Sequence, residues 1–172
     1  MAKLRVSDHI FNFISRKIGK TTAFTVAGGG NMFLVDSVAR NPDFDVVCCH
    51  HEQACAMASV GYSKLLGVPS IVIPTTGCAG TNVITGLLDA WQDSVPMLCI
   101  AGQVNASQTS RLSKSKIRKF GVQEADLVSI VSSITKYSAL VSDASDIRYH
   151  MERAIHECIT GRFGCSLRHP KD

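Results

Sequence analysis

The sequence predicts a three-layer α/β/α fold built on a mostly parallel sheet. Apolar stretches of strand length alternate with segments of helical period along almost the whole chain. The apolar stretches are continuous, whereas strands with one wet face alternate apolar and polar residues, so both faces of this sheet should be covered. No internal repeat or linker divides the 172 residues, so we expect one domain.

The first half of the chain carries three helices and two strands. Val6–Ile18 has apolar residues at a helical period, with Ser7 as a candidate N-cap and Gly19 as a candidate end. Residues 23–30 read as a strand running into a glycine turn, and residues 31–40 as a helix. Residues 44–49 read as a buried strand, and residues 53–66, rich in Ala, Met and Leu, as a helix ending at Gly67.

The second half continues the alternation. Residues 69–77 read as a strand that enters a turn, 81–92 as a helix and 95–103 as a fourth strand. A helix is expected within residues 120–134, a short strand over 137–142 and a last helix over 145–160. Ser145 is the candidate cap of that last helix.

Composition narrows the class of protein. The formal charge is +4, and the basic run at 111–119 lacks interleaved aromatic residues, so we expect a solvated loop there and no nucleic-acid site. The seven cysteines include no CxxC pair, which argues against a metal site, and they sit mostly in apolar runs. No apolar leader or membrane-length run is present, so we expect a cytoplasmic protein.

Ligands of open α/β sheets bind beyond the carboxyl ends of the strands. The glycines at 28–30 follow the first strand, but they match neither GxGxxG nor a P-loop. Two interpretations stay open: a tight turn that needs positive φ, or a turn that lets a ligand approach the backbone.

The loop "TTGCAGTN", at 75–82, follows the third strand and presents backbone N–H groups and small polar side chains. Thr81 or Asn82 should cap the next helix, although capping alone would not require Gly77 and Gly80 as well. Cys78 could act as a nucleophile, but nothing in the sequence places a histidine beside it.

Glu52 stands where the second strand gives way to a helix. It could be an ordinary acidic residue of a first helical turn, a partner of a nearby histidine, or a buried acid that holds a proton for catalysis. The local sequence favours the first interpretation.

The motifs in their order nevertheless resemble one family. "HEQACAMASVGY", "TTGCAGTN", "GLLDAWQDSVP" and "GQ" are similar to the pyrimidine-binding (PYR) domain of thiamine-diphosphate enzymes, in particular to the acetolactate synthase branch. The resemblance covers residues 6–164 and implies a flavodoxin-like or Rossmann-like domain at 1–164, followed by an atypical tail at 165–172.

The resemblance implies a role for Glu52 as the glutamate that faces N1′ of the cofactor's aminopyrimidine ring and shares a proton with it. Gln123 matches a glutamine near the substrate, which would be a pyruvate-like 2-keto acid. The residues expected to line the thiamine diphosphate pocket with Glu52 are Ala27, Gly28, Gly29, Thr75, Thr76, Gly77 and Asn82. Ala27 stands where acetolactate synthases usually carry proline.

The family's second module, the pyrophosphate-binding (PP) domain, carries a GDG motif and holds the diphosphate through Mg²⁺. This chain contains no GDG and no residues placed to hold that metal, so we expect weak activity without a PP partner. Dimerisation through helices 53–66 and 81–92 is also expected.

The tail leaves alternatives open. Ser166, Arg168 and His169 are poor residues for a buried strand, which indicates a truncated or frame-shifted fragment. The competing interpretations are a PYR-only alpha subunit of a two-chain 2-keto acid decarboxylase, a non-catalytic dimerisation module, and an unrelated nucleotide-binding domain.

Overall fold

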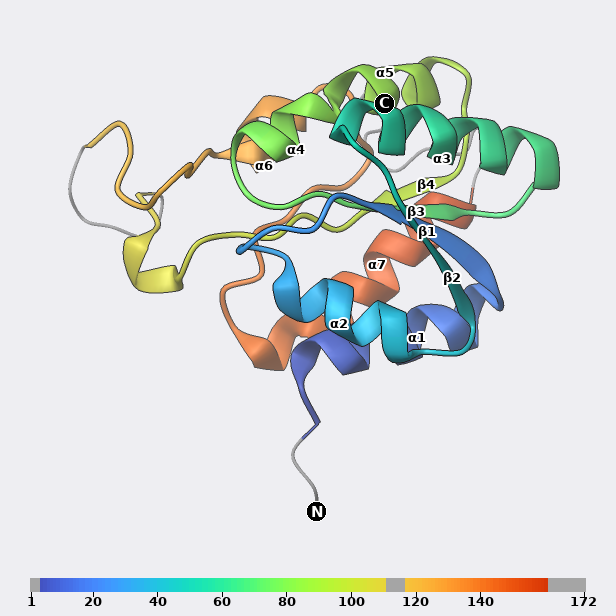
Figure 1. Cartoon of the computed structure of the whole chain (residues 1–172), viewed down its shortest axis with the longest axis horizontal. Coiled ribbons are helices and arrows are strands. Elements are labelled where there is room, and N and C mark those ends of the chain that lie inside the picture. The colour runs from blue at the N-terminus through green and yellow to red at the C-terminus, as the bar shows by residue number, and fades with distance from the viewer. Residues whose placement is uncertain (1–3, 111–116, 161–172) are drawn as a thin grey trace, which may run out of the picture.

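A computed structural model describes residues 4–110 and 117–160 (Figure 1). These residues form a four-stranded, all-parallel sheet in the order β2-β1-β3-β4. The strands are β1 (Thr21–Thr25), β2 (Phe44–Cys48), β3 (Ser70–Ile73) and β4 (Met97–Cys99). The register pairs Thr25 with Cys48 on one side and with Ile73 on the other, so the carboxyl ends of three strands lie level.

Helices cover both faces of the sheet, which confirms the predicted three-layer fold (Figure 1). The helices are α1 (Val6–Ile18), α2 (Met32–Arg40), α3 (Glu52–Leu66), α4 (Cys78–Asn82), α5 (Ile84–Gln92), α6 (Leu127–Val131) and α7 (Ile147–Ile159). Figure 1 shows α1, α2 and α7 beneath the sheet and α3 to α6 above it.

The side chains of the two central strands, β1 and β3, belong to two separate hydrophobic cores. Ala23 and Ile71 point toward the core under α1, α2 and α7, whereas Phe24 and Val72, the next residue of each strand, point toward the core under α3 and α5. Because successive side chains of a strand face opposite ways, both residues of each pair must be apolar. This explains the continuous apolar runs of the sequence.

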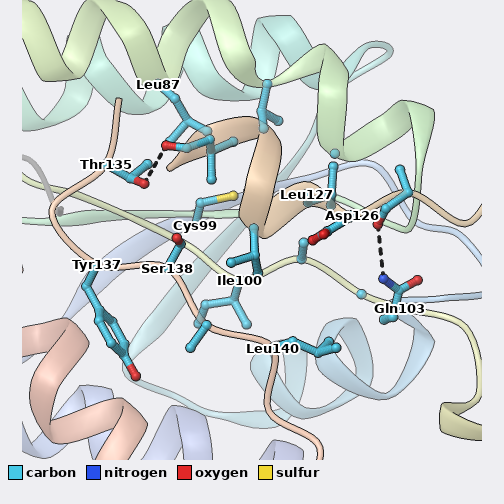
Figure 2. A pocket seen from close by; sticks show the side chains of 18 of the residues that line it. Leu87, Cys99, Ile100, Gln103, Asp126, Leu127, Thr135, Tyr137, Ser138 and Leu140 are labelled. Carbon is cyan, nitrogen blue, oxygen red and sulfur yellow. Dashed lines mark hydrogen bonds between the residues drawn. The ribbon is translucent and has the colours of Figure 1, made fainter. Parts of the chain in front are cut away.

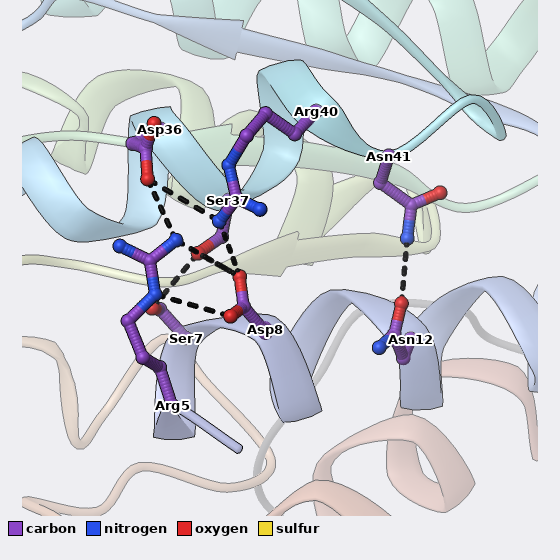
Figure 3. Close-up of polar contacts among 8 residues, drawn as sticks. All are labelled: Arg5, Ser7, Asp8, Asn12, Asp36, Ser37, Arg40 and Asn41. Atoms are coloured by element: carbon purple, nitrogen blue, oxygen red, sulfur yellow. Dashed lines mark hydrogen bonds and ion pairs between the residues drawn. The ribbon is translucent and has the colours of Figure 1, made fainter. Parts of the chain in front are cut away.

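Helices α1 and α2 are joined by charged residues at their exposed edge (Figure 3). The Oδ1 atom of Asp8 accepts hydrogen bonds from Arg40 and from the Ser37 hydroxyl, both at 2.7 Å. Arg5 donates to the other oxygen of Asp8 at 3.1 Å and to Asp36 at 2.7 Å. The network fixes one helix against the other.

Strand β2 differs from its expected burial. It is an edge strand that pairs with β1 alone, so Phe44 is buried while Val47 and Cys48 are exposed. The apolar run at 44–49 therefore predicted the strand correctly, but one face of this strand is exposed.

Two predicted helix ends are confirmed, and one predicted cap is wrong. Gly19 and Gly67 follow α1 and α3 with φ of +76° and +68°, values that favour glycine. Ser7 does not cap α1: Arg5 holds the N-cap position, and Ser7 lies inside the helix, where its hydroxyl is hydrogen-bonded to that of Ser37.

The helix expected at 81–92 starts earlier and is broken. Helix α4 begins at Cys78 after Gly77, and Val83 separates it from α5. Thr81 and Asn82 therefore lie inside α4 and cap neither helix. Ser145 likewise fails as a cap, because it sits in a 3₁₀ turn before α7 and donates its own N–H to Asp143.

The region after residue 120 departs most from expectation. Within 120–134 the helix is confined to α6, because residues 121–124 form a turn held by the Glu124 carboxylate. Residues 137–142 form no strand, because a cavity separates them from β4. The tail at 165–172 and most of the basic run at 111–119 lie outside the described residues.

Over residues 4–110 and 117–160, no helix is both long enough and apolar enough to cross a membrane.

Candidate functional site

Two glycine-containing loops pack against each other at the carboxyl ends of β1 and β3. The backbone N–H of Gly30 donates to the Thr75 hydroxyl at 3.0 Å. A Cβ atom at Gly28 would lie 2.8 Å from the Thr75 side chain, which is too close. None of Gly28, Gly29 and Gly30 has positive φ, so the tight-turn interpretation is wrong and close packing explains Gly28.

Asn31 holds the first of these loops in place. Its side chain is fully buried, and its Nδ2 donates to the carbonyls of Val26 at 3.0 Å and Ile73 at 2.9 Å. Its Oδ1 accepts from the Gly28 N–H at 2.8 Å. Asn31 was not predicted from the sequence, although an amide directly after three glycines was an available signal.

A third loop, after β4, closes the same region. The Gly102 N–H donates to Pro74 O at 2.9 Å, and a Cβ atom at Gly102 would lie 2.3 Å from Gly30 O. The Thr76 hydroxyl donates to Gln103 Oε1 at 2.8 Å. Three strand ends are thereby joined into one backbone-lined surface of small residues.

The turn at 121–124 lies over this surface. Gly77 has φ of +64°, and a Cβ atom there would come within 1.6 Å of the Gln123 carbonyl oxygen. Gln123 itself is exposed, with φ of +58°. Gly80 makes similar room for Leu127 of α6, at 2.3 Å. Gly77 thus makes room for the 121–124 turn, and Gly80 makes room for α6.

Glu124 stabilises this turn. Its carboxylate accepts hydrogen bonds from the N–H groups of Phe120 at 2.9 Å and Gly121 at 3.4 Å, and from the Ser110 hydroxyl at 2.7 Å. These hydrogen bonds, with that of the Ser110 hydroxyl the strongest, lower the pKa of Glu124 to about 2. Nothing in the sequence distinguished this glutamate from any other.

Glu52 is the first residue of α3, and its side chain is half-buried. His51 caps the helix, because its Nδ1 accepts from the Gln53 N–H at 3.1 Å, so the Glu52 carboxylate is not used as a cap. Asn82, at the end of α4, donates its Nδ2 to Glu52 Oε2 at 2.9 Å. Among the described residues no hydrogen-bond donor is found for Oε1.

An apolar cavity of about 230 Å³ lies beside this surface (Figure 2). Leu98 and Ile100 line it from β4 and its extension, Leu87 from α5, and Leu140 from the facing segment. Gln103 lies at one end, where its Nε2 donates to Ala125 O at 3.4 Å. The cavity accounts for the missing strand at 137–142 and opens next to the loops of the candidate site.

The structure therefore gathers most of the residues singled out in the sequence. Gly28, Thr75, Thr76, Gly77 and Gln123 belong to one set of packed loops. Glu52 and Asn82 form a hydrogen-bonded pair beside them. Ala27 and Gly29 lie exposed on the first loop, where a Cβ atom on Gly29 would meet nothing within 4 Å. Their roles toward a ligand stay predictions.

Comparison with known proteins gives consistent matches. The family model described as "Thiamine pyrophosphate enzyme, N-terminal TPP binding domain" matches residues 4–130. The mitochondrial acetolactate synthase of Schizosaccharomyces pombe is 32% identical over 169 residues, which cover 98% of this chain and 24% of the relative.

The chloroplastic acetolactate synthase of Arabidopsis thaliana is 36% identical over 155 residues, 90% of this chain and 22% of the relative. The acetolactate synthase isozyme 2 large subunit of Escherichia coli is 35% identical over 158 residues, 91% of this chain and 27% of the relative. The chain spans about a quarter of the length of these relatives.

Proposed function

Because this chain belongs to the thiamine pyrophosphate enzymes, as their N-terminal TPP-binding domain, we propose that it is the pyrimidine-binding half of an acetolactate synthase-like enzyme. The cofactor is thiamine diphosphate, and the substrates are pyruvate-like 2-keto acids that are decarboxylated and joined. A PP domain, from this protein or a partner, supplies the Mg²⁺ site and the diphosphate contacts.

The Glu52–Asn82 pair carries this proposal. The carboxylate is half-buried, is held at Oε2 by a neutral amide, and has Oε1 directed to no donor among the described residues. A carboxyl group so placed can exchange a proton with a ring nitrogen. A carboxylate with one oxygen held by Asn82 fits the ring nitrogen of an aminopyrimidine.

The surrounding loops fit the remainder of such a ligand. Residues 28–30, 75–77 and 101–103 present backbone and small side chains at one sheet edge, where a flat ring can approach closely. When bound, thiamine diphosphate supplies the electron sink for decarboxylation. Asn82 orients the Glu52 carboxylate, and Gln123, exposed above Gly77, is the proposed substrate contact.

An exposed face on α3 and α5 supports a partner for this chain. Five residues of α3 lie exposed at helical spacing, and Leu88 of α5 is also exposed. We call this the α3–α5 face; its residues are Ala54, Met57, Ala58, Gly61, Leu65 and Leu88. Such a small-residue apolar face suits a second copy of this chain or a related PYR subunit.

The same face favours one alternative to catalysis: a dimerisation module that binds no cofactor. A PYR-only alpha subunit of a two-chain 2-keto acid decarboxylase combines both ideas, since it needs a PP subunit to act. The catalytic proposals and the non-catalytic module differ in whether thiamine diphosphate and Mg²⁺ bind once a PP domain is present.

Substitution of Glu52 by Gln tests the function. The chain is mixed with a separately expressed acetolactate synthase PP domain, thiamine diphosphate and Mg²⁺, and acetolactate formed from pyruvate is measured. We expect E52Q to lower kcat by about 100-fold or more, because an amide cannot exchange the proton. Activity within twofold of the unmodified chain would exclude the role of Glu52.

Glu152→Gln, an exposed change on α7, is the matched control and should leave activity unchanged. If neither the unmodified chain nor the control binds cofactor with the PP domain, the non-catalytic module is the better account. Thermal melting of all three chains verifies that each is folded.

A further inference from the structure

Gln103 is a half-buried glutamine in the loop after β4, and its amide joins three parts of the candidate site. Its Oε1 accepts hydrogen bonds from the Thr76 hydroxyl at 2.8 Å and from the Val104 N–H at 2.9 Å. Its Nε2 donates to the Ala125 carbonyl at 3.4 Å (Figure 2). One side chain therefore connects the loop after β3, its own loop, and the segment that follows the 121–124 turn.

The chemistry of these partners fixes the orientation of the Gln103 amide. The Val104 N–H can only donate, so it must face the amide oxygen, and the Ala125 carbonyl can only accept, so it must face the amide nitrogen. A carboxylate at this position could not donate to Ala125, and an ammonium group could not accept from Val104. The position thus uses both the acceptor and the donor of a glutamine.

The turn before this carbonyl contains a strained residue. Gln123 has φ of +58°, in the left-handed region that residues other than glycine rarely adopt. Such a conformation persists only where the surrounding structure holds it. Glu124 holds the turn at its start, by accepting from the N–H groups of Phe120 and Gly121. Gln103 holds it at its end, at the carbonyl two residues after Gln123.

We propose that Gln103 is a positioning residue, which holds Gln123 in its strained conformation over Gly77 and ties it to the loop after β3. A Cβ atom at Gly77 would lie 1.6 Å from the Gln123 carbonyl oxygen, so the turn packs directly on that loop. Gln103 adds a hydrogen-bonded connection between the two, from Thr76 to Ala125. Its role toward a substrate rests on the proposed function, in which Gln123 contacts the 2-keto acid.

For the enzyme, this role predicts a larger effect on substrate binding than on the chemical step. Among the described residues, Gln103 makes no hydrogen bond to Glu52 or Asn82, so proton exchange at Glu52 should continue without it. A loosened Gln123 would bind the 2-keto acid less well in the ground state and in the transition state alike. Loss of such uniform binding raises KM and leaves kcat nearly unchanged.

Hydrogen exchange of the chain alone tests the positioning, because it needs neither cofactor nor a PP domain. In Gln103→Met, a change of similar size that removes the amide, we expect the amides of residues 119–126 to exchange about three- to tenfold faster. Gln103→Glu should do the same, because its carboxylate can accept from Thr76 and Val104 but cannot donate to Ala125. Mass spectrometry of the peptic peptides from this segment gives the rate.

Two control variants separate this effect from a general loosening of the fold. Gln92→Met makes the same change at the exposed end of α5 and should leave exchange in 119–126 unaltered. Thr76→Val removes one partner of Gln103 Oε1 but leaves the bond from Nε2 to Ala125, so it should change exchange in this segment by less than about twofold. Thermal melting verifies that each chain is folded.

Acetolactate formation from pyruvate, with the separately expressed PP domain, thiamine diphosphate and Mg²⁺, tests the role toward the substrate. We expect Q103M to raise KM about tenfold and to change kcat by less than about threefold. Q92M should match the unmodified chain in both constants.

Several results would overturn the proposal. One is exchange in 119–126 of Q103M within twofold of the unmodified chain. Another is unchanged exchange in Q103E, which would mean that the donor to Ala125 is not needed. A lower kcat with unchanged KM would move the role of Gln103 to the chemical step. If even the unmodified chain forms no acetolactate, the proposed function fails, while the exchange rates still decide whether Gln103 positions the turn.

Discussion

At the scale of single residues, glycine at 77 is required for two separate reasons. Its φ of +64° disfavours any side chain, and the carbonyl of Gln123 occupies the space that a Cβ atom would need. The close contact sets the height of the 121–124 turn above the loop after β3. One glycine therefore lets the turn with Gln123, the proposed substrate contact, lie directly against the loop after β3.

Three glycine-to-alanine variants separate these effects. Gly29 has neither positive φ nor a close neighbour, Gly19 has φ of +76° with open space around it, and Gly77 combines strain with a clash. We expect a change in the free energy of unfolding within about 0.5 kcal/mol for G29A, about 1–3 kcal/mol for G19A, and a larger loss for G77A. Urea denaturation measures all three, and equal losses for G19A and G77A would contradict the contact with Gln123.

At the scale of elements, helices α1 and α2 depend on Asp8 for their mutual position. The hydrogen bond from Ser37, followed by that from Arg5, lowers the pKa of Asp8 below its usual value of 3.8. A carboxyl whose folded pKa is depressed stabilises the fold above its unfolded pKa. That stabilisation disappears as pH falls through the folded value.

We therefore expect Asp8→Asn to reduce stability at pH 6 and to have progressively less effect as pH falls below about 4. The difference in unfolding free energy between the two chains, measured by denaturation at several pH values, should follow this profile. Asp45→Asn, on the exposed edge strand and facing Lys20, is the control. A D8N effect independent of pH would mean that shape, and not charge, holds the helices.

The elements with clear hydrophobic patterns could be predicted from the sequence. The elements that depend on contacts with distant residues could not. Strands β1 and β3 were recognisable because both faces of each are buried, and α3 because residues 53–66 are rich in Ala, Met and Leu and end at Gly67. The break at Val83 could not be predicted from the sequence, because it depends on the position of α4 in the folded chain. The strand expected at 137–142 needed a neighbour, and the cavity beside β4 leaves it without one.

The residues of the candidate site also differ in whether the sequence could predict them. Glu52, Asn82 and the loops at 28–30 and 75–77 could be predicted because a motif order marked them. Asn31 and Glu124 could not, because their importance comes from burial and from several simultaneous hydrogen bonds. Such networks join residues that are distant in sequence and have no local pattern.

At the scale of the whole molecule, the proposed partner is expected to bind the α3–α5 face. Ala58→Arg places a long charged side chain at its centre, where a partner helix would pack. We expect at least a tenfold weaker dimer by sedimentation velocity, with an unchanged melting profile of the monomer. His156→Arg, on the opposite layer, should not alter association. Identical sedimentation of all chains as monomers would contradict the proposed face.

The contact between α3 and α5 has an effect beyond packing. A Cβ atom at Gly86 would come within 2.4 Å of the Ala56 side chain, so the two helix backbones nearly touch. Glu52 begins one of these helices, and Asn82 ends the short helix that leads into the other. We therefore expect the close approach of Ala56 and Gly86 to influence the separation between the Glu52 carboxylate and the Asn82 amide. A methyl group added at Gly86 would push α3 and α5 apart, and we expect it to lengthen the hydrogen bond between Asn82 and Glu52.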